Sequence, residues 1–245
     1  MLTAMGPSGS SIGSSGGSGP VLAFDRVSFS VADGRELLHE VTLGAAPASI
    51  TVLAGPSGAG KSTLLRLGNR LELPSSGTVR FMGVDVSESD PRQLRRRVGM
   101  VFQRPVPFAG TVRSNLAVGA PSASDDELVS SLDRVGLDSS MLDRVADDLS
   151  GGEAQRMCIA RTLLTGPSVI LMDEPTSSLD PDNRLGIELL ARALADEGIA
   201  VVWVSHDLAQ VERIADSVVV LVDGRNATID EAERYLQHHG SDGDR

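Results

Sequence analysis

The second half of the chain alternates between short apolar runs and longer segments whose apolar residues recur at helical spacing. Each apolar run is long enough for one buried strand, and each intervening segment for one helix. This alternation is typical of an α/β core with parallel strands and right-handed helical crossovers. After residue 149 the predicted elements are helix Gly152–Leu164, strand Val169–Met172, helix Asp182–Ala195, strand Ile199–Val204, helix Leu208–Ala215 and strand Ser217–Val222.

The first part of the chain has the alternating apolar and polar pattern of antiparallel strands. These strands are predicted at Leu22–Phe24, Val27–Val31 and Leu37–Leu43, with Asp33 and Gly34 forming a hairpin turn. The next predicted elements belong to the core. They are strand Ser49–Ala54, a helix from Lys61 to about Asn69, strand Thr78–Met82, a helix over residues 90–98 and strand Val98–Phe102.

Residues 103–150 interrupt this pattern. Pro105, Pro107 and Gly110 break the chain, and Ser124–Val135 then has the periodicity of a helix. We therefore expect an α-helical subdomain inserted into the core at about residues 103–150.

Both ends of the chain are predicted to be tails. Residues 1–20 are rich in Gly and Ser and cannot bury enough apolar surface to offset the entropy of ordering, so we expect a disordered tail. Residues 236–245 are predicted to be a flexible tail. One folded domain, residues 21–235, remains.

The segment between the central strand and its helix, residues 55–62, has the sequence GPSGAGKS of a phosphate loop. Its glycines allow a tight turn that points backbone N–H groups at anionic oxygen. Lys61 adds a cation for the β- and γ-phosphates, and Ser62 a hydroxyl for Mg²⁺. The predicted phosphate-binding residues are Gly55, Pro56, Ser57, Gly58, Ala59, Gly60, Lys61, Ser62 and Thr63, the last near the α-phosphate.

Two carboxylates, Asp173 and Glu174, follow the apolar strand Val169–Met172. Ligands of open α/β sheets bind outside the carboxyl ends of the strands, so both acids are predicted to face the nucleotide. Asp173 is the predicted metal ligand, directly or through water. Glu174 is the candidate that orients or deprotonates an attacking water.

A second candidate anion site is the signature segment, LSGGE at residues 149–153. Ser150, Gly151 and Gly152 directly precede a predicted helix. A serine cap beside glycines leaves amide groups and the positive helix end available for an anion.

The chain has 245 residues, a net charge of −11 and a pI near 4.8. An acidic chain argues against a broad nucleic-acid surface, so no nucleic-acid partner is expected. Arg92 and residues 95–97 form a local basic cluster, either a solvated helix face or a contact with a partner or membrane surface. The chain has no run of about 20 apolar residues that could span a membrane.

The order of these motifs resembles the nucleotide-binding subunit of ATP-binding cassette (ABC) transporters. The resemblance is carried by GPSGAGKS, VFQRP, LSGGEAQR, VILMDEP, SSLD and WVSHD, and covers roughly residues 21–225. It implies a P-loop, RecA-like core with an N-terminal antiparallel β subdomain and an inserted helical subdomain. It also implies ATP and Mg²⁺ as cofactors and ATP hydrolysis as the activity.

The resemblance further implies roles for residues that the pattern alone leaves as ordinary loop positions. Gln103 is expected near the metal and the attacking water, and His206 against the γ-phosphate. Ser150, Gly151 and Gly152 are expected to close over the γ-phosphate bound by a second copy, in a homodimer that holds two ATP molecules. Asp180 is expected to help link the two sites.

One position departs from the family pattern. Family members usually carry an aromatic residue upstream of the phosphate loop that stacks on adenine, and the corresponding residue here is Val31. Phe29 lies two residues earlier, on the same face of a strand, and whether it substitutes stays open. The departure predicts weak discrimination between nucleotide bases.

The resemblance implies a motor subunit that drives a solute through a separate integral membrane permease. It is expected to be cytoplasmic, held at the inner face of the cell membrane by that permease. Two subgroups are similar: the phosphate-import ATPases, and the iron-export and aluminium-tolerance ATPases, which the short linker Pro105–Thr111 favours. The alternative is a non-transport ABC ATPase acting on a macromolecular complex. Such ATPases usually carry two cassettes or a long coiled coil, and neither occurs here.

Overall fold

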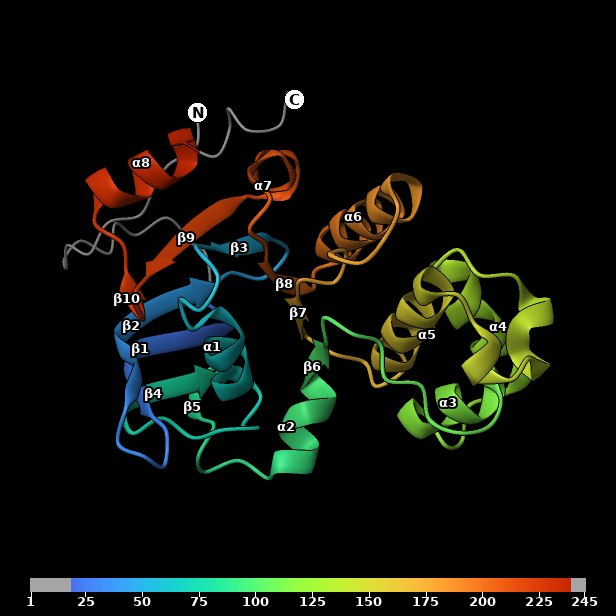
Figure 1. Cartoon of the computed structure of the whole chain (residues 1–245). Helices are drawn as coiled ribbons and strands as arrows, with labels where there is room; N and C mark the ends of the chain where they lie inside the picture. The colour runs from blue at the N-terminus through green and yellow to red at the C-terminus, as the bar shows by residue number, and fades with distance from the viewer. Residues whose placement is uncertain (1–18, 239–245) are drawn as a thin grey trace.

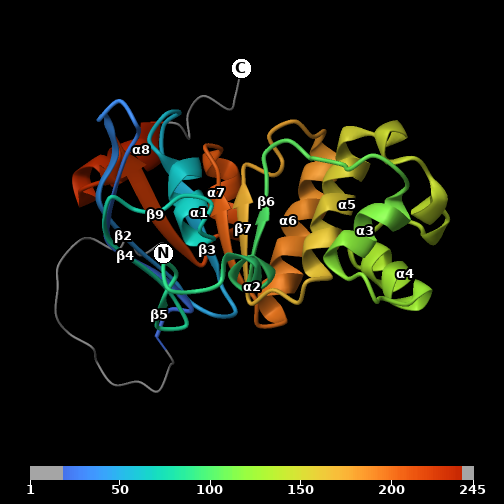
Figure 2. The same cartoon turned by 90° about the horizontal axis from the view of Figure 1, so that it is seen from below.

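The computed structural model describes residues 19–238 and contains a six-stranded sheet, a four-stranded antiparallel sheet and a block of helices (Figures 1 and 2). This three-part architecture confirms the predicted fold class. The predicted N-terminal tail lies outside the described residues, apart from Gly19 and Pro20. So does the predicted C-terminal tail, apart from residues 236–238, which continue helix α8 (Ile229–His238).

The six-stranded sheet forms the centre of the molecule. It consists of β3 (Ile50–Ala54), β6 (Val98–Val101), β7 (Val169–Asp173), β8 (Ala200–Val204), β9 (Ser217–Val222) and β10 (Arg225–Asn226). The order is β10-β9-β3-β8-β7-β6, with β10 antiparallel to β9 and all other pairs parallel. The carboxyl ends of the parallel strands therefore meet at one edge of the sheet, where an α/β fold binds its ligand.

The antiparallel sheet consists of β1 (Leu22–Ser30), β2 (Glu36–Ala45), β4 (Ser76–Phe81) and β5 (Val84–Asp85), in the order β2-β1-β4-β5. The two strands predicted before residue 32 are one continuous strand, β1. The pairing of β1 with β2 shifts register after Phe24, and Arg26 has a φ of 46°. This bulge bends the strand without ending it.

Helices cover both faces of the six-stranded sheet, and the antiparallel sheet packs on one of these faces. On one face, α1 (Lys61–Gly68) and α2 (Pro91–Arg97) share an apolar cluster with β1 and β2. On the other, α6 (Pro181–Asp196) and α7 (Leu208–Ile214) pack against the alternate side chains of the same strands, Trp203 among them. Burial on both faces explains why β3, β7 and β8 are almost wholly apolar.

The helical block lies beside this core (Figure 2). It contains α3 (Val112–Gly119), α4 (Asp125–Arg134) and two short 3₁₀ segments, Ser139–Asp143 and Ala146–Asp148. Helix α5 (Gly151–Leu163) begins after the predicted end of the subdomain at residue 150, yet it packs against both α3 and α4. The block is therefore larger than the sequence pattern indicates.

A buried polar contact joins α6 to α7 behind the carboxyl edge of the sheet. The Glu188 side chain is only 4% exposed, and Arg213 donates to both of its oxygens at 2.9 and 3.0 Å. Gln210 donates to the same carboxylate at 2.8 Å, and its side-chain oxygen accepts from the indole N–H of Trp203 at 3.0 Å.

Arg213→Ala is expected to lower the free energy of unfolding by about 1–3 kcal/mol, because it leaves a buried carboxylate short of donors. Urea denaturation measures this change. Glu212→Ala, at an exposed position on the same helix, is the control. Equal effects of the two substitutions would contradict the prediction.

Candidate active site

The phosphate loop connects the end of β3 to the start of α1. Two of its glycines leave no room for a side chain. A Cβ on Gly55 would lie 2.1 Å from the backbone oxygen of Leu221, and a Cβ on Gly60 would lie 2.5 Å from Cδ2 of Leu38. Their φ angles, 142° and 93°, are also ones that L side chains rarely adopt. Neighbouring strands therefore define the shape of the loop.

The ammonium group of Lys61 lies inside this loop. Its Nζ donates hydrogen bonds to the backbone oxygens of Gly55 and Pro56 at 2.7 and 2.8 Å. Burial lowers the pKa of Lys61, while the nearby carboxylates of Glu174 and Asp173 raise it. A cation at the N-terminus of a helix, beside a loop of free amides, suits phosphate oxygens.

Ser62 and Asp173 form a pair of oxygen ligands next to Lys61. Ser62 Oγ donates to Asp173 Oδ1 at 2.8 Å. Burial raises the pKa of Asp173; the hydrogen bond from Ser62 lowers it, and the charge of Glu174 raises it further. A hydroxyl and a carboxylate are oxygen donors of the kind that Mg²⁺ accepts beside substrate phosphates and water. Within residues 19–238 no group of three or more His, Cys, Asp or Glu side chains is arranged to hold a metal ion by itself.

Glu174 is the centre of a second cluster at the ends of β6, β7 and β8. Nε2 of Gln103 donates to Oε2 of Glu174 at 3.2 Å, and Nδ1 of His206 lies 3.3 Å from the same oxygen. Glu174 has a φ of 44°, a left-handed conformation that costs a non-glycine residue about 1–3 kcal/mol. The fold thus holds this carboxylate in a strained position between two side chains from neighbouring strands.

Most of these groups line one hollow of about 690 Å³ at the carboxyl edge of the sheet; Gly55 and Asp173 are not part of its lining, and Asp173 lies behind Ser62. Leu37 from β2 and Tyr235 from α8 also line the hollow, and the sequence pattern predicted neither. The predicted residues that line the hollow are Pro56, Ser57, Gly58, Ala59, Gly60, Lys61, Ser62, Thr63, Gln103, Glu174 and His206.

A signal for Tyr235 does exist in the sequence. It is the only tyrosine of the chain, and Ala232, Tyr235 and Leu236 recur at the spacing of one helix face.

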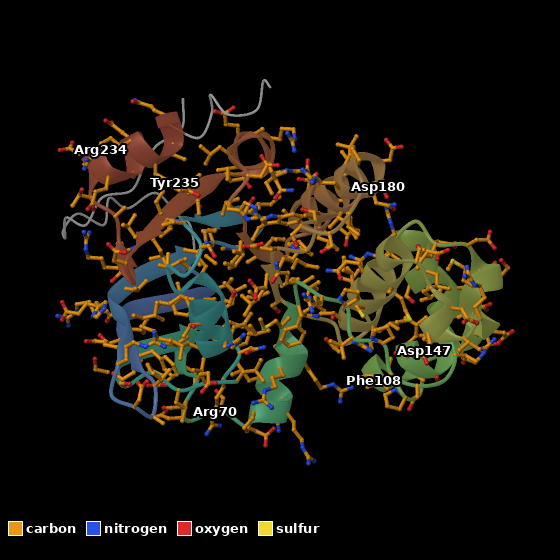
Figure 3. The ribbon with its side chains drawn as sticks, viewed as in Figure 1. Arg70, Phe108, Asp147, Asp180, Arg234 and Tyr235 are labelled. Carbon is orange, nitrogen blue, oxygen red and sulfur yellow. The ribbon has the colours of Figure 1, made fainter. Side chains whose placement is uncertain are left out.

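The signature segment and Asp180 do not line this hollow. Ser150 caps α5 and accepts a hydrogen bond from the N–H of Glu153, while Asp180 caps α6 and accepts one from the N–H of Asn183. Gly152 packs directly on Asn183, whose amide lies 3.0–3.1 Å from where a Cβ of Gly152 would be. The signature segment and the start of α6 therefore contact each other and do not contribute to the hollow. They lie on the side of the molecule where Figure 3 labels Asp180.

Val31 also lies outside the lining of the hollow. Its N–H donates to the oxygen of Arg35 at 3.0 Å and its oxygen accepts from Gly34 at 2.9 Å, so it closes the hairpin between β1 and β2. Phe29 is part of β1 and packs against the apolar cluster beneath α1. No residue of β1 is part of the lining of the hollow.

Comparison with known proteins places these features in a family. A family model described as ABC transporter matches residues 38–177. ABC transporter I family member 17 of Arabidopsis thaliana is 41% identical over 221 residues, which covers 84% of each chain. Protein STAR1 of Oryza sativa subsp. japonica is 44% identical over 200 residues, 80% of this chain and 58% of that protein.

One more relative and one solved structure resemble the chain over most of its length. Phosphate import ATP-binding protein PstB 2 of Natronomonas pharaonis is 39% identical over 222 residues, 83% of this chain and 78% of that protein. The solved structure of cbiO1 of Clostridium perfringens, part of the ABC transporter complex cbiONQ, is 28% identical with a TM-score of 0.79, covering 91% of this chain and 93% of that one. The chain therefore belongs to the ABC transporter family, as an ATP-binding subunit that hydrolyses ATP.

Proposed function

We propose that the hollow beside the phosphate loop binds ATP with Mg²⁺, and that two copies of the chain use this ATP to drive a solute through a separate membrane subunit. One observation carries the proposal. A phosphate-binding cation (Lys61), a hydroxyl hydrogen-bonded to a buried carboxylate (Ser62 to Asp173) and a carboxylate held by two partners (Glu174) meet at a single hollow, which Lys61, Ser62 and Glu174 line.

In this mechanism Lys61 and the loop amides bind the β- and γ-phosphates, and Ser62 and Asp173 hold Mg²⁺. The bound Mg²⁺ supplies positive charge that offsets the charge on the phosphate oxygens in the transition state. Glu174 orients a water and accepts its proton while the water oxygen attacks the γ-phosphorus. The bond to the β–γ bridging oxygen then breaks, giving ADP and phosphate.

Gln103 and His206 have a positioning task in this mechanism. Both contact Oε2 of Glu174, so the other carboxylate oxygen is the one available to the water. With nucleotide and Mg²⁺ bound, His206 would face the γ-phosphate and Gln103 would lie near the metal. Side chains at the ends of β6, β7 and β8 would thereby position one water molecule.

The position of the signature segment supports a second copy as partner. Ser150 and Gly151 are exposed at the start of α5, whose positive end attracts an anion. The N–H of Ser150 donates to the carboxylate of Glu153 at 2.8 Å, so a phosphate would bind beside that carboxylate. Neither Ser150 nor Gly151 lines the hollow of its own chain. We propose that each signature segment binds the γ-phosphate held by the other copy, and that Asp180 links the two sites.

Exposed apolar side chains between the core and the helical block support the proposal that a membrane subunit binds here. Arg161 of α5 holds the loop that carries Val106 and Phe108. The guanidinium of Arg161 donates to the backbone oxygen of Val106 at 3.1 Å and lies 4.3 Å from the centre of the Phe108 ring. Figure 3 shows Phe108 beside α3. Val106 and Phe108 are exposed, and the neighbouring segments also carry exposed apolar side chains at Phe102, Val118 and Val145. No helix in residues 19–238 has the length and hydropathy needed to cross a bilayer.

We propose phosphate import or metal-ion export as the transport activity, at the inner face of the cell membrane. The test is to identify a multi-span membrane protein in the neighbouring reading frames and to reconstitute it with the chain in liposomes. ATP hydrolysis and solute movement are then measured with phosphate, iron or aluminium on each side. Hydrolysis that no membrane protein alters would contradict the transport role.

Base discrimination is expected to be weak, because Val31 offers no aromatic face to adenine. The KM for GTP is predicted to lie within about tenfold of the KM for ATP. Val31→Tyr is predicted to lower the KM for ATP by about fivefold or more, as stacking contributes 1–3 kcal/mol per base in nucleic-acid systems. Steady-state kinetics with both nucleotides test this. A strong preference of the unmodified chain for ATP would refute the idea.

A further inference from the structure

Glu174, the proposed base, lies in a turn that follows β7. Its backbone oxygen accepts a hydrogen bond from the N–H of Ser177 at 3.2 Å, and its φ is 44°. A non-glycine residue keeps this left-handed conformation only where the surrounding structure holds it there. The side chain of Thr176, within the same turn, is 4% exposed and supplies a buried hydroxyl for such a contact.

The buried side chain of Gln210, on α7, makes this contact. Its Nε2 donates to Oγ1 of Thr176 at 3.0 Å and also to Oε1 of Glu188 at 2.8 Å. Its Oε1 accepts from the indole N–H of Trp203 at 3.0 Å. A side-chain amide has two N–H donors and one oxygen, so every polar group of the Gln210 side chain has a partner. The amide cannot turn away from Thr176 without leaving a buried group unpaired, which fixes its orientation.

Gln210 is also bonded to the chain on both sides of His206. Trp203, on β8, lies three residues before His206, and Asp207 directly follows it. The backbone N–H of Gln210 donates to Oδ1 of Asp207 at 3.1 Å. Glu174 and His206 themselves approach to 3.3 Å, between Oε2 and Nδ1. One buried residue therefore contacts the chain segments that present both members of this pair.

Close packing alone does not hold the turn of Glu174 in place. A small cavity of about 80 Å³ lies beside the turn. The side chains that line it include the pair and the two residues that hold it, Glu174, His206, Thr176 and Gln210. Side chains that border a cavity lack van der Waals contacts on that side. The hydrogen bond from Gln210 to Thr176 therefore has a larger share in keeping Glu174 at its position than it would have in a filled core.

We propose that Gln210 is a positioning residue for ATP hydrolysis, which holds the turn of Glu174 against the strand end of His206. Gln210 does not line the nucleotide hollow, so its effect is on the geometry of the reacting groups and not on nucleotide binding. The inference rests on the proposed role of Glu174 and goes beyond it. It makes α7, which lies outside the segment matched by the family model, a determinant of the hydrolysis rate.

The test is Gln210→Met, which keeps the length of the side chain and removes its hydrogen bonds. The kcat and the single-turnover rate of ATP hydrolysis are expected to fall about tenfold to hundredfold, as when a catalytic group is misplaced by about 1 Å. The KM and the dissociation constant for ATP are expected to stay unchanged. Thr176→Val removes the other end of the same hydrogen bond and is expected to have the same effect. The double variant should be no slower than the slower single variant.

Arg213→Ala is the control, because Arg213 donates to Glu188 in the same buried cluster rather than to Thr176. It is expected to lower the free energy of unfolding and to leave kcat unchanged. Equal losses of kcat in Arg213→Ala and Gln210→Met would reduce the role of Gln210 to stability and overturn the inference. So would an unmodified rate in Gln210→Met, or in Thr176→Val if Gln210→Met does not fold, while Glu174→Gln is inactive. An unmodified rate in Glu174→Gln would instead refute the proposed site.

Discussion

Glu174→Gln is expected to retain ATP binding and to lower steady-state hydrolysis about 10²–10⁴-fold. The amide keeps the size of the side chain and can still contact Gln103 and His206, but it cannot accept a proton from water. With hydrolysis blocked, ATP should keep two copies of the chain together. Phosphate release measures the rate, and size-exclusion chromatography with light scattering and Mg²⁺-ATP measures the dimer.

Glu212→Gln, at an exposed position on α7, is the matched control and should hydrolyse ATP at the unmodified rate. Hydrolysis by Glu174→Gln at that rate would remove Glu174 from the mechanism. A variant that stays monomeric with Mg²⁺-ATP, both alone and with the membrane subunit, would contradict the proposed homodimer.

Lys61→Ala is expected to abolish measurable ATP binding. The substitution removes the charge-assisted hydrogen bonds to the phosphates, each contributing about 1.5–3 kcal/mol, so two of them correspond to at least a hundredfold loss of affinity. It also leaves the oxygens of Gly55 and Pro56 without their donor. Isothermal titration calorimetry measures the affinity, and near-UV circular dichroism shows whether the variant is folded.

The sequence permits a second, independent measurement, because Lys61 is the only lysine of the chain. A lysine-specific acylating reagent can therefore modify one side chain besides the N-terminal amine. ATP is expected to protect Lys61 from the reagent and to leave the N-terminal amine reactive, as mass spectrometry would show. Equal modification with and without ATP, in a folded protein, would contradict binding at this loop.

The strand and helix pattern predicted most of the core correctly, because both faces of the central strands are buried and their apolar runs are unbroken. It placed Lys61, Ser62 and Asp173 at the carboxyl edge of the sheet, where the structure has them. Gln103 and His206 could be assigned to the site only from the family resemblance, which implies positions near the metal and the γ-phosphate, since each residue alone is an ordinary loop position. Their contacts with Glu174 were not predicted.

Other features depend on tertiary contacts that a local pattern does not contain. The positive φ of Glu174 follows from how its strand end is packed, and the bulge at Arg26 from pairing with β2. Helix α5 belongs to the helical block because of its partners, which lie far away in sequence. Tyr235 reaches the hollow only through the path of β9 and β10, although its helix has a recognisable apolar face.

Helix α5 has thirteen residues, so it is about 20 Å long. One end carries the cap that is proposed to grip a nucleotide across the dimer; near the other end, Arg161 holds Val106 and Phe108. A rigid helix with contacts at both ends transmits a movement of one end to the other. If the proposed dimer draws the capped end of α5 toward a neighbouring copy, the end that contacts Val106 and Phe108 moves with it. The same helix would then link the nucleotide site to the proposed contact with the membrane subunit.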